Sequence, residues 1–141
     1  ADIKKILTTK KKYFDHVVCG YCNLRKEERA ENINIPKVVI NKKNELVYMS
    51  RLPVPGTKNN NKKLRSKDYL KQVCIYAFNS DELKKFSSFK KKSEIEKLED
   101  IEILRFLETD IKIKMVKTSG NSVAVDVPND VKKVEKLLNK K

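Results

Sequence analysis

Glycine is scarce in this sequence of 141 residues, which contains only Gly20, Gly56 and Gly120. Neither of the common glycine-rich phosphate-binding loops can be built from three glycines so far apart. The sequence also lacks any apolar run close to the roughly 20 residues that span a bilayer, and it does not open with a signal-peptide pattern. We therefore predict no membrane partner and a cytoplasmic location.

Cysteine is limited to three residues, an odd number that cannot pair completely and that favours a reducing compartment. Cys19 and Cys22 form a single CxxC motif, which occurs in zinc and redox sites. The sequence holds no second CxxC motif, however, and Cys74 is distant. We therefore predict that Cys19 and Cys22 are buried or half-buried free thiols on a strand.

Arginine is also scarce, although the formal net charge is +14. The basic residues comprise 28 lysines and five arginines, whereas the planar, bidentate arginine is the usual reader of phosphates and guanines. The lysines are spread from Lys4 to Lys141 and do not gather beside aromatic residues. We interpret them as solvated surface, so nucleic acid is not the predicted partner. A basic module that binds nucleic acid or another polyanion is kept as the alternative.

A hydrophobic content of 39% and a charged content of 37% indicate a modest core below a polar surface in one domain. Short apolar runs alternate with helical patterns, which predicts an α/β fold with a mixed sheet and flanking helices. Residues 41–44 are expected to form the turn of a hairpin. The expected helices cover residues 2–12, 79–86, 93–107 and 128–138, and the expected strands cover residues 14–24, 36–40, 46–50, 72–78, 111–116 and 122–127.

The helix predicted at residues 93–107 is unusually acidic, since seven of the 19 acidic residues lie between positions 94 and 110. A serine–glutamate capping box marks its start. At about 100° per residue, Glu102 shares an apolar side with Leu98 and Phe106, and Arg105 is next to it. A carboxylate in this place is unfavourable unless it is paired or used. Two interpretations stay open: an ion pair at the edge of the core, or a ligand-binding group.

Asp126 is a second notable acidic residue, because it lies between a predicted strand end and a predicted helix start. Ligands gather at such places in open α/β sheets, and proteins bind Mg²⁺ through one or two carboxylates together with substrate phosphates. Asp126 is therefore a candidate magnesium ligand, or else a turn residue that caps the helix. Arg51 and Tyr76 also lie at or near strand ends, where a structural and a functional role are both open.

Four stretches between residues 36 and 138 carry a resemblance to a known family. They are Leu46-Val-Tyr-Met-Ser-Arg-Leu-Pro-Val-Pro-Gly56, Gln72-Val-Cys-Ile-Tyr76, the Glu-x-x-Glu-x-x-Glu-x-Leu-Arg pattern that ends at Arg105, and Val125-Asp-Val-Pro-Asn-Asp130. In order and spacing they resemble the C-terminal half of the CMP-KDO synthetase (3-deoxy-manno-octulosonate cytidylyltransferase) family and of its near neighbours, the acylneuraminate cytidylyltransferases. The resemblance implies the C-terminal part of a Rossmann-like, glycosyltransferase-A-like nucleotidyltransferase fold.

The resemblance also implies an activity, which is the transfer of CMP from CTP to the anomeric hydroxyl of a 2-keto sugar acid (KDO or a nonulosonic acid) with release of pyrophosphate. Three residues match residues of the sugar site in that family, namely Arg51, Tyr76 and Glu102, and Gln72 occupies a further position of that site. Asp126 matches the second of two aspartates that hold the catalytic Mg²⁺. The implied ligands are therefore CTP, a 2-keto sugar acid and Mg²⁺.

The sequence departs from the family pattern at two positions of the sugar site. Gln72 stands where a histidine is usual, and Ile103 stands where a glutamine is usual, which implies a different 2-keto sugar acid, such as a nonulosonic acid. Residues 52–57 and the neighbouring strand resemble the part through which the family forms homodimers. Nothing in residues 1–35 matches the family's CTP-binding loop or its first metal aspartate. The resemblance therefore implies that residues 1–141 are the C-terminal portion of one cytidylyltransferase domain, inactive by itself.

Overall fold

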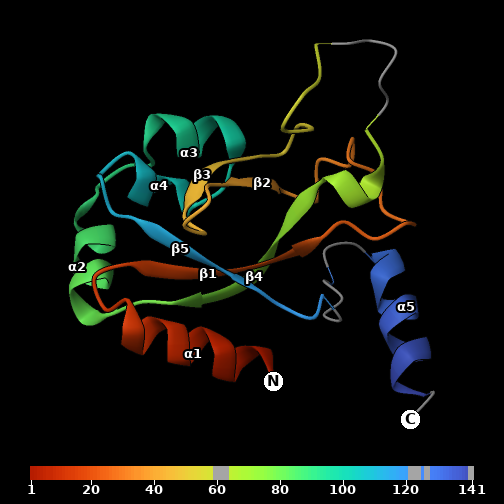
Figure 1. Cartoon of the computed structure of the whole chain (residues 1–141), viewed down its shortest axis with the longest axis horizontal. Coiled ribbons are helices and arrows are strands. Elements are labelled where there is room, and N and C mark those ends of the chain that lie inside the picture. Colours follow the sequence, from red (N-terminus) through yellow and green to blue (C-terminus); the bar gives the residue numbers. More distant parts are fainter. Residues whose placement is uncertain (59–63, 121–124, 126–127, 140–141) are drawn as a thin grey trace.

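The computed structural model describes residues 1–58, 64–120, 125 and 128–139. Within these ranges a five-stranded sheet has the order β3–β2–β4–β1–β5 (Figure 1). No helix in these ranges is long and apolar enough to cross a membrane. The elements in chain order are α1 (Asp2–Lys12), β1 (Val17–Asn23), β2 (Lys37–Ile40), β3 (Leu46–Ser50), the 3₁₀ helix η1 (Ser66–Asp68), β4 (Leu70–Ala77), α2 (Ser80–Ser88), α3 (Glu94–Glu99), α4 (Leu104–Leu107), β5 (Ile113–Lys117) and α5 (Pro128–Leu138).

The sheet contains both parallel and antiparallel pairs. β1 runs antiparallel to β4 and parallel to β5, while β2 runs antiparallel to both β3 and β4. The pairing of β2 with β4 is short, because it joins only Lys37 to Lys71 and Val38 to Leu70. The predicted α/β fold with a mixed sheet and flanking helices is confirmed, and so is the β2–β3 hairpin.

Helices cover both faces of the sheet. Successive side chains of a strand point to opposite faces, so neighbouring residues of β1 belong to different clusters. Val18 packs with Ile6 of α1 on one face, while Val17 packs with Leu104 of α4 on the other. Figure 1 accordingly shows α1 on one side of the sheet and α3 and α4 on the other. The larger core lies between the sheet and the α3–α4 segment.

The segment predicted as one helix at residues 93–107 is instead two short helices, α3 and α4. Asp100 ends α3 in a left-handed conformation with φ of +52°, and its N–H donates to the carbonyl oxygen of Glu96. The predicted apolar side is therefore wrong, because Leu98 is 86% exposed whereas Phe106 is buried. The helical phase does not continue across the break.

The other predicted helices, α1, α2 and α5, are confirmed, as are five of the predicted strands. Asn79 caps α2, since its Oδ1 accepts a hydrogen bond from the Glu82 N–H at 2.8 Å. The strand predicted at residues 122–127 lies outside the described residues except for Val125. β4 is not covered along its whole length, because Cys74 is exposed.

Cys19 and Cys22 are buried free thiols, as predicted. Cys19 lies in the larger core beside Met49 and Met115, and burial raises the pKa of its thiol well above the ordinary value. In the part of the chain that the structure describes, no three His, Cys, Asp or Glu side chains are grouped closely enough to hold a metal ion. Cys19 contributes to the apolar packing of the larger core.

Lys10 shows that lysine is not always solvated surface in this protein. Its Nζ donates to both carboxylate oxygens of Glu82, at 2.6 and 2.7 Å, and to the carbonyl oxygens of Phe14 (2.8 Å) and His16 (2.7 Å). Lys10 and Glu82 are both buried, and their ion pair connects α1 to the start of α2. Lys37 is also buried between backbone carbonyl groups, and this burial lowers its pKa.

Gly120 has a φ of +70°, in the left-handed region where other residues are strained. Gly120→Ala is expected to lower the free energy of unfolding by about 1–2 kcal/mol. The added Cβ would also lie 3.1 Å from the Cβ and Sγ atoms of Cys22. Gly56→Ala is the matched control, since no described atom lies within 4 Å of a Cβ there. Urea unfolding followed by circular dichroism measures both variants, and equal effects would contradict this account.

Candidate functional site

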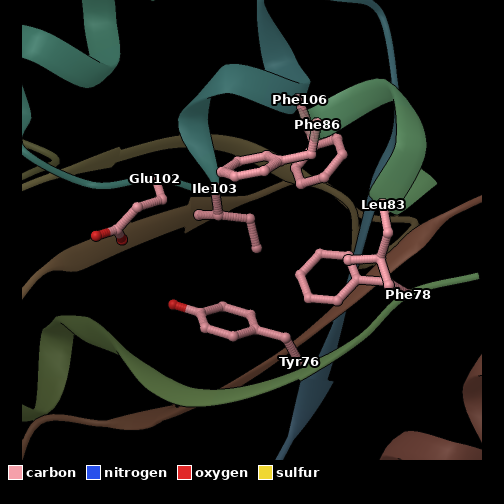
Figure 2. Close-up of a pocket in the computed structure, with 7 residues that line it drawn as sticks. All are labelled: Tyr76, Phe78, Leu83, Phe86, Glu102, Ile103 and Phe106. Atoms are coloured by element: carbon pink, nitrogen blue, oxygen red, sulfur yellow. The ribbon is translucent and has the colours of Figure 1, made fainter. Parts of the chain in front are cut away.

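A small pocket opens between β4, α2 and the segment that leads into α4. It encloses about 130 Å³, and Figure 2 shows the side chains around it. One end of the pocket is polar and carries a hydroxyl and a carboxylate, and the rest is apolar. The lining residues are Tyr76, Phe78, Leu83, Phe86, Glu102, Ile103 and Phe106.

The polar end brings together three of the residues predicted for the sugar site. The Tyr76 hydroxyl and the Glu102 carboxylate lie on the same side of Ile103 (Figure 2), and the buried Gln72 donates from Nε2 to the Tyr76 hydroxyl. Burial, followed by neighbouring thiols and Glu102, raises the pKa of Tyr76 well above its ordinary value. The phenol is therefore neutral at physiological pH and can donate a hydrogen bond to a ligand.

Glu102 reaches the pocket because the chain leaves helical geometry after α3. The side chain is exposed, and the described residues give its carboxylate no hydrogen-bond or ion-pair partner. The predicted neighbour Arg105 does not pair with it, since the Arg105 guanidinium binds Glu96. The interpretation of Glu102 as half of a helix ion pair is therefore wrong, and its carboxylate is available to a ligand.

The apolar end of the pocket is built from aromatic rings in mutual contact. Phe106 lies with its ring centroid 5.6 Å from that of Phe78 and 5.4 Å from that of Phe86, and the Tyr76 ring lies 5.9 Å from that of Phe78. Such offset contacts between aromatic rings are favourable. They contribute to the packing of the pocket wall.

A buried ion pair, between Arg105 and Glu96, contacts the Phe86 ring of this wall. Arg105 donates from Nε and Nη2 to the two carboxylate oxygens of Glu96, at 2.6 and 2.7 Å, and its guanidinium lies 4.0 Å from the centroid of the Phe86 ring. The hydrogen bonds from Arg105 lower the pKa of Glu96. Sequence analysis missed this pair, because residues nine positions apart are not neighbours on a continuous helix.

Arg51 follows β3 as predicted, but its guanidinium does not line the pocket. It donates to three backbone carbonyl oxygens, those of Glu99 (2.5 Å), Asp100 (2.8 Å) and Ile33 (2.9 Å). The Arg51 N–H also donates to the Glu99 carboxylate at 2.8 Å. Arg51 therefore caps the end of α3 in this structure, and its role in binding a sugar acid stays a prediction.

Asp126, the predicted magnesium ligand, lies outside the described residues. Its role and the requirement for Mg²⁺ stay predictions. The described part of the site provides a neutral hydroxyl, an amide and a carboxylate beside an apolar hollow. These groups can bind the hydroxyls of a small polar molecule, and they include no nucleophile poised beside a general base.

Comparison with known proteins gives consistent matches over most of the chain. The model of a family described as Cytidylyltransferase matches residues 1–113. The chain is 36% identical over 110 residues to the 3-deoxy-manno-octulosonate cytidylyltransferase of Bacteroides thetaiotaomicron, covering 77% of this chain and 44% of that protein. It is 38% identical over 112 residues to the protein of the same name from Bdellovibrio bacteriovorus, covering 79% of this chain and 45% of that one.

A solved structure of CMP:2-keto-3-deoxy-manno-octonic acid synthetase complexed with CTP superposes with a TM-score of 0.84 and 29% identity. The match covers 99% of this chain and 56% of that one. Both the family match and the superposition include residues 1–35, where sequence analysis found no resemblance. The chain spans about half the length of the curated relatives that it matches, and its assignment to their C-terminal half stays a prediction.

Proposed function

The chain belongs to the cytidylyltransferase family, and we propose that it is part of an enzyme that transfers CMP from CTP to a 2-keto sugar acid. In the proposed reaction, the anomeric hydroxyl of the sugar acid attacks the α-phosphorus of CTP and pyrophosphate leaves. The names of the relatives, and the CTP bound to the structural neighbour, support this assignment. The sugar acid is KDO or a nonulosonic acid.

The single observation that carries the proposal is the meeting of Tyr76 and Glu102 at one pocket. These residues lie 26 positions apart, on β4 and before α4, and sequence resemblance had named both for the sugar site. We propose that Glu102 accepts hydrogen bonds from sugar hydroxyls, and that the Tyr76 hydroxyl, oriented by Gln72, donates one. Arg51 is proposed to contribute at the edge of the same site.

Asp126 is the residue that we propose to hold Mg²⁺, because a carboxylate oxygen fits the preference of this ion. When bound, Mg²⁺ supplies charge neutralisation at the phosphates and lowers the pKa of the attacking hydroxyl. The chain's own residues position the sugar acid. Because the chain spans about half the length of its relatives, we propose that it binds the sugar acid but does not turn over CTP alone.

A homodimer is also proposed. β3 lies at one edge of the sheet, and the segment after it carries Leu52, which is 65% exposed. Val47 on β3 is exposed as well. Among the described residues this edge of the sheet has no further strand, and apolar side chains beside such an edge are suited to contact with a second copy.

Glu102→Gln is expected to weaken the binding of KDO or a nonulosonic acid to the 141-residue chain about tenfold, because one charge-assisted hydrogen bond contributes about 1.5–3 kcal/mol. Glu94→Gln is the matched control, since Glu94 is an exposed residue of α3 paired only with Lys97 among the described residues. NMR titration of the labelled chain measures both. Equal affinities for the two variants would contradict the proposed role of Glu102.

The net charge of +14 favours one alternative function, the binding of nucleic acid or another polyanion. Such binding would weaken steeply with salt, because it depends on the release of counterions. Filter binding of single- and double-stranded nucleic acid at low and high salt separates the two functions. No retention at low salt removes the alternative.

A further inference from the structure

We infer that Cys74 is a positioning residue of the same site, whose thiol directs the Tyr76 hydroxyl toward the bound sugar acid. This inference rests on the proposed function and adds a residue that the sequence resemblance did not name for the site. It is carried by the place of Cys74 on β4, between the site residues Gln72 and Tyr76, and by the contact of its thiol with the Tyr76 hydroxyl.

β4 bulges at Cys74 and Ile75, which have no partner on β1. The bulge lies between two paired positions, Tyr76 opposite Cys19 and Val73 opposite Gly20. On its other side β4 pairs with β2 only at Leu70 and Lys71 among the described residues, and Cys74, beyond this pairing, is exposed. Bulges re-aim side chains and are common beside active sites. A ligand at the Tyr76 hydroxyl can therefore also reach the Cys74 thiol.

The Tyr76 hydroxyl has two neighbours that fix its orientation. Its oxygen accepts a hydrogen bond from Gln72 Nε2, which leaves the phenolic proton for another acceptor. Burial is the main cause that raises the pKa of Tyr76, and a hydrogen bond with the Cys74 thiol raises it further. A hydrogen bond raises the pKa of a phenol when the neutral phenol is the donor. The Tyr76 hydroxyl therefore donates to Cys74 Sγ.

A thiol sulfur suits a hydroxyl that must exchange its partner when a ligand binds. Sulfur accepts hydrogen bonds only weakly, so an oxygen of the sugar acid can replace Cys74 Sγ as the acceptor with little loss. Without Cys74 the phenolic proton would have no preferred direction, and ordering it would add to the cost of binding. Cys74 thus prepares the Tyr76 hydroxyl for the ligand without competing strongly for its proton.

Alkylation with iodoacetamide reports on Cys74 rather than on the other two cysteines. Cys19 is 0% exposed and Cys22 is 3% exposed, and burial raises the pKa of both thiols, which lowers the fraction of the reactive thiolate. In the reaction the Cys74 thiolate attacks the methylene carbon of the reagent, iodide leaves as the C–S bond forms, and solvent takes up the thiol proton. Mass spectrometry of peptides gives the rate at each cysteine.

The first experiment measures this alkylation in the 141-residue chain with and without KDO or a nonulosonic acid. At a concentration of about ten times Kd only about a tenth of the sites are empty, so we expect alkylation of Cys74 to slow about tenfold. Leu98→Cys adds a reference thiol at an exposed position of α3, and its alkylation should not change. Unchanged alkylation of Cys74, while NMR titration shows binding, would overturn the inference and leave the proposed function intact. Failure of both sugar acids to bind would overturn the proposed function, and the inference with it.

Variants of Cys74 test whether it acts through Tyr76. Cys74→Ala is expected to weaken binding of the sugar acid about two- to tenfold, the range of one net hydrogen bond. Cys74→Ser should recover most of the affinity, because its hydroxyl also accepts, and the control Leu98→Ala should leave the affinity unchanged. In a Tyr76→Phe chain, which has no phenolic proton to direct, Cys74→Ala should change the affinity by less than about twofold. The full effect of Cys74→Ala in that chain, unchanged affinity of Cys74→Ala alone, or equal losses in Cys74→Ala and Cys74→Ser would overturn the inference.

Discussion

Arg105→Met is expected to lower the free energy of unfolding of the chain by about 3–5 kcal/mol, the range found when one partner of a buried ion pair is removed. Glu96 is 1% exposed and Arg105 is 9% exposed. The substitution leaves the Glu96 carboxylate in the interior without its two hydrogen bonds from the guanidinium. Urea unfolding at neutral pH, followed by circular dichroism, measures the difference.

Two further variants show whether the effect comes from the buried charge. Lys97→Met breaks an exposed pair with Glu94, and we expect it to change stability by less than about 1 kcal/mol. Glu96→Leu combined with Arg105→Met removes both charges, and it should recover most of the lost stability, because no unpaired carboxylate remains. A double variant as unstable as Arg105→Met alone would show that packing, rather than charge, accounts for the loss.

The pH dependence of this pair has a definite sign. Hydrogen bonds from Arg105 lower the pKa of Glu96 below its ordinary value of 4.5, so the pair stabilises the fold above that value and the stabilisation is lost as the pH falls through the folded-state pKa. In Arg105→Met, burial without the guanidinium raises the pKa of Glu96 instead, because the hydrogen bond from the Ser93 N–H at 3.2 Å is the one that remains among the described residues. Acidification then protonates the buried carboxylate, and the stability gap between the two proteins should narrow from pH 7 to pH 3.

The sheet and three of the helices could be predicted because their signals are local. Alternating or continuous apolar runs indicate β1 to β5. Asn79 precedes α2 and Pro128 begins α5, so each residue indicates the start of a helix from its immediate neighbourhood in the sequence. The break at Asp100 could not be predicted in this way. The sequence on both sides favours a helix, and the groups that bind the free carbonyls at the break belong to Arg51, 49 positions away.

The pocket also contains residues that could be named from the sequence and residues whose place depends on contacts between distant segments. Tyr76 and Glu102 were named from resemblance, whereas the residue pattern alone left Glu102 as a possible ion-pair partner. Phe86 was missed, because its place in the wall depends on the packing of α2 against α4, which no local pattern encodes. Buried lysines such as Lys10 were missed for the same reason, since the partner Glu82 lies 72 positions away.

Arg51→Met is expected to lower the free energy of unfolding by about 3 kcal/mol, because three hydrogen bonds from a charged group to backbone carbonyls are lost, two at the end of α3 and one at Ile33. The Glu99 carboxylate keeps the hydrogen bond from the backbone N–H of residue 51. Arg51→Lys should recover little of the loss, because an ammonium group cannot reproduce the planar fork that serves three acceptors. Arg29→Met is the control, since that side chain is 83% exposed.

The Arg51 variants also separate the capping role from the predicted role in sugar binding. Unfolding by urea gives the stability, and NMR titration with KDO or a nonulosonic acid, at a temperature where Arg51→Met is folded, gives the affinity. A loss of stability with unchanged affinity assigns Arg51 to the end of α3 alone. An additional fall in affinity places the guanidinium in the sugar site, as the family resemblance implies. Unchanged stability would contradict the capping role, because the carbonyl oxygens of Glu99 and Asp100 at the break would then be satisfied equally well without the guanidinium.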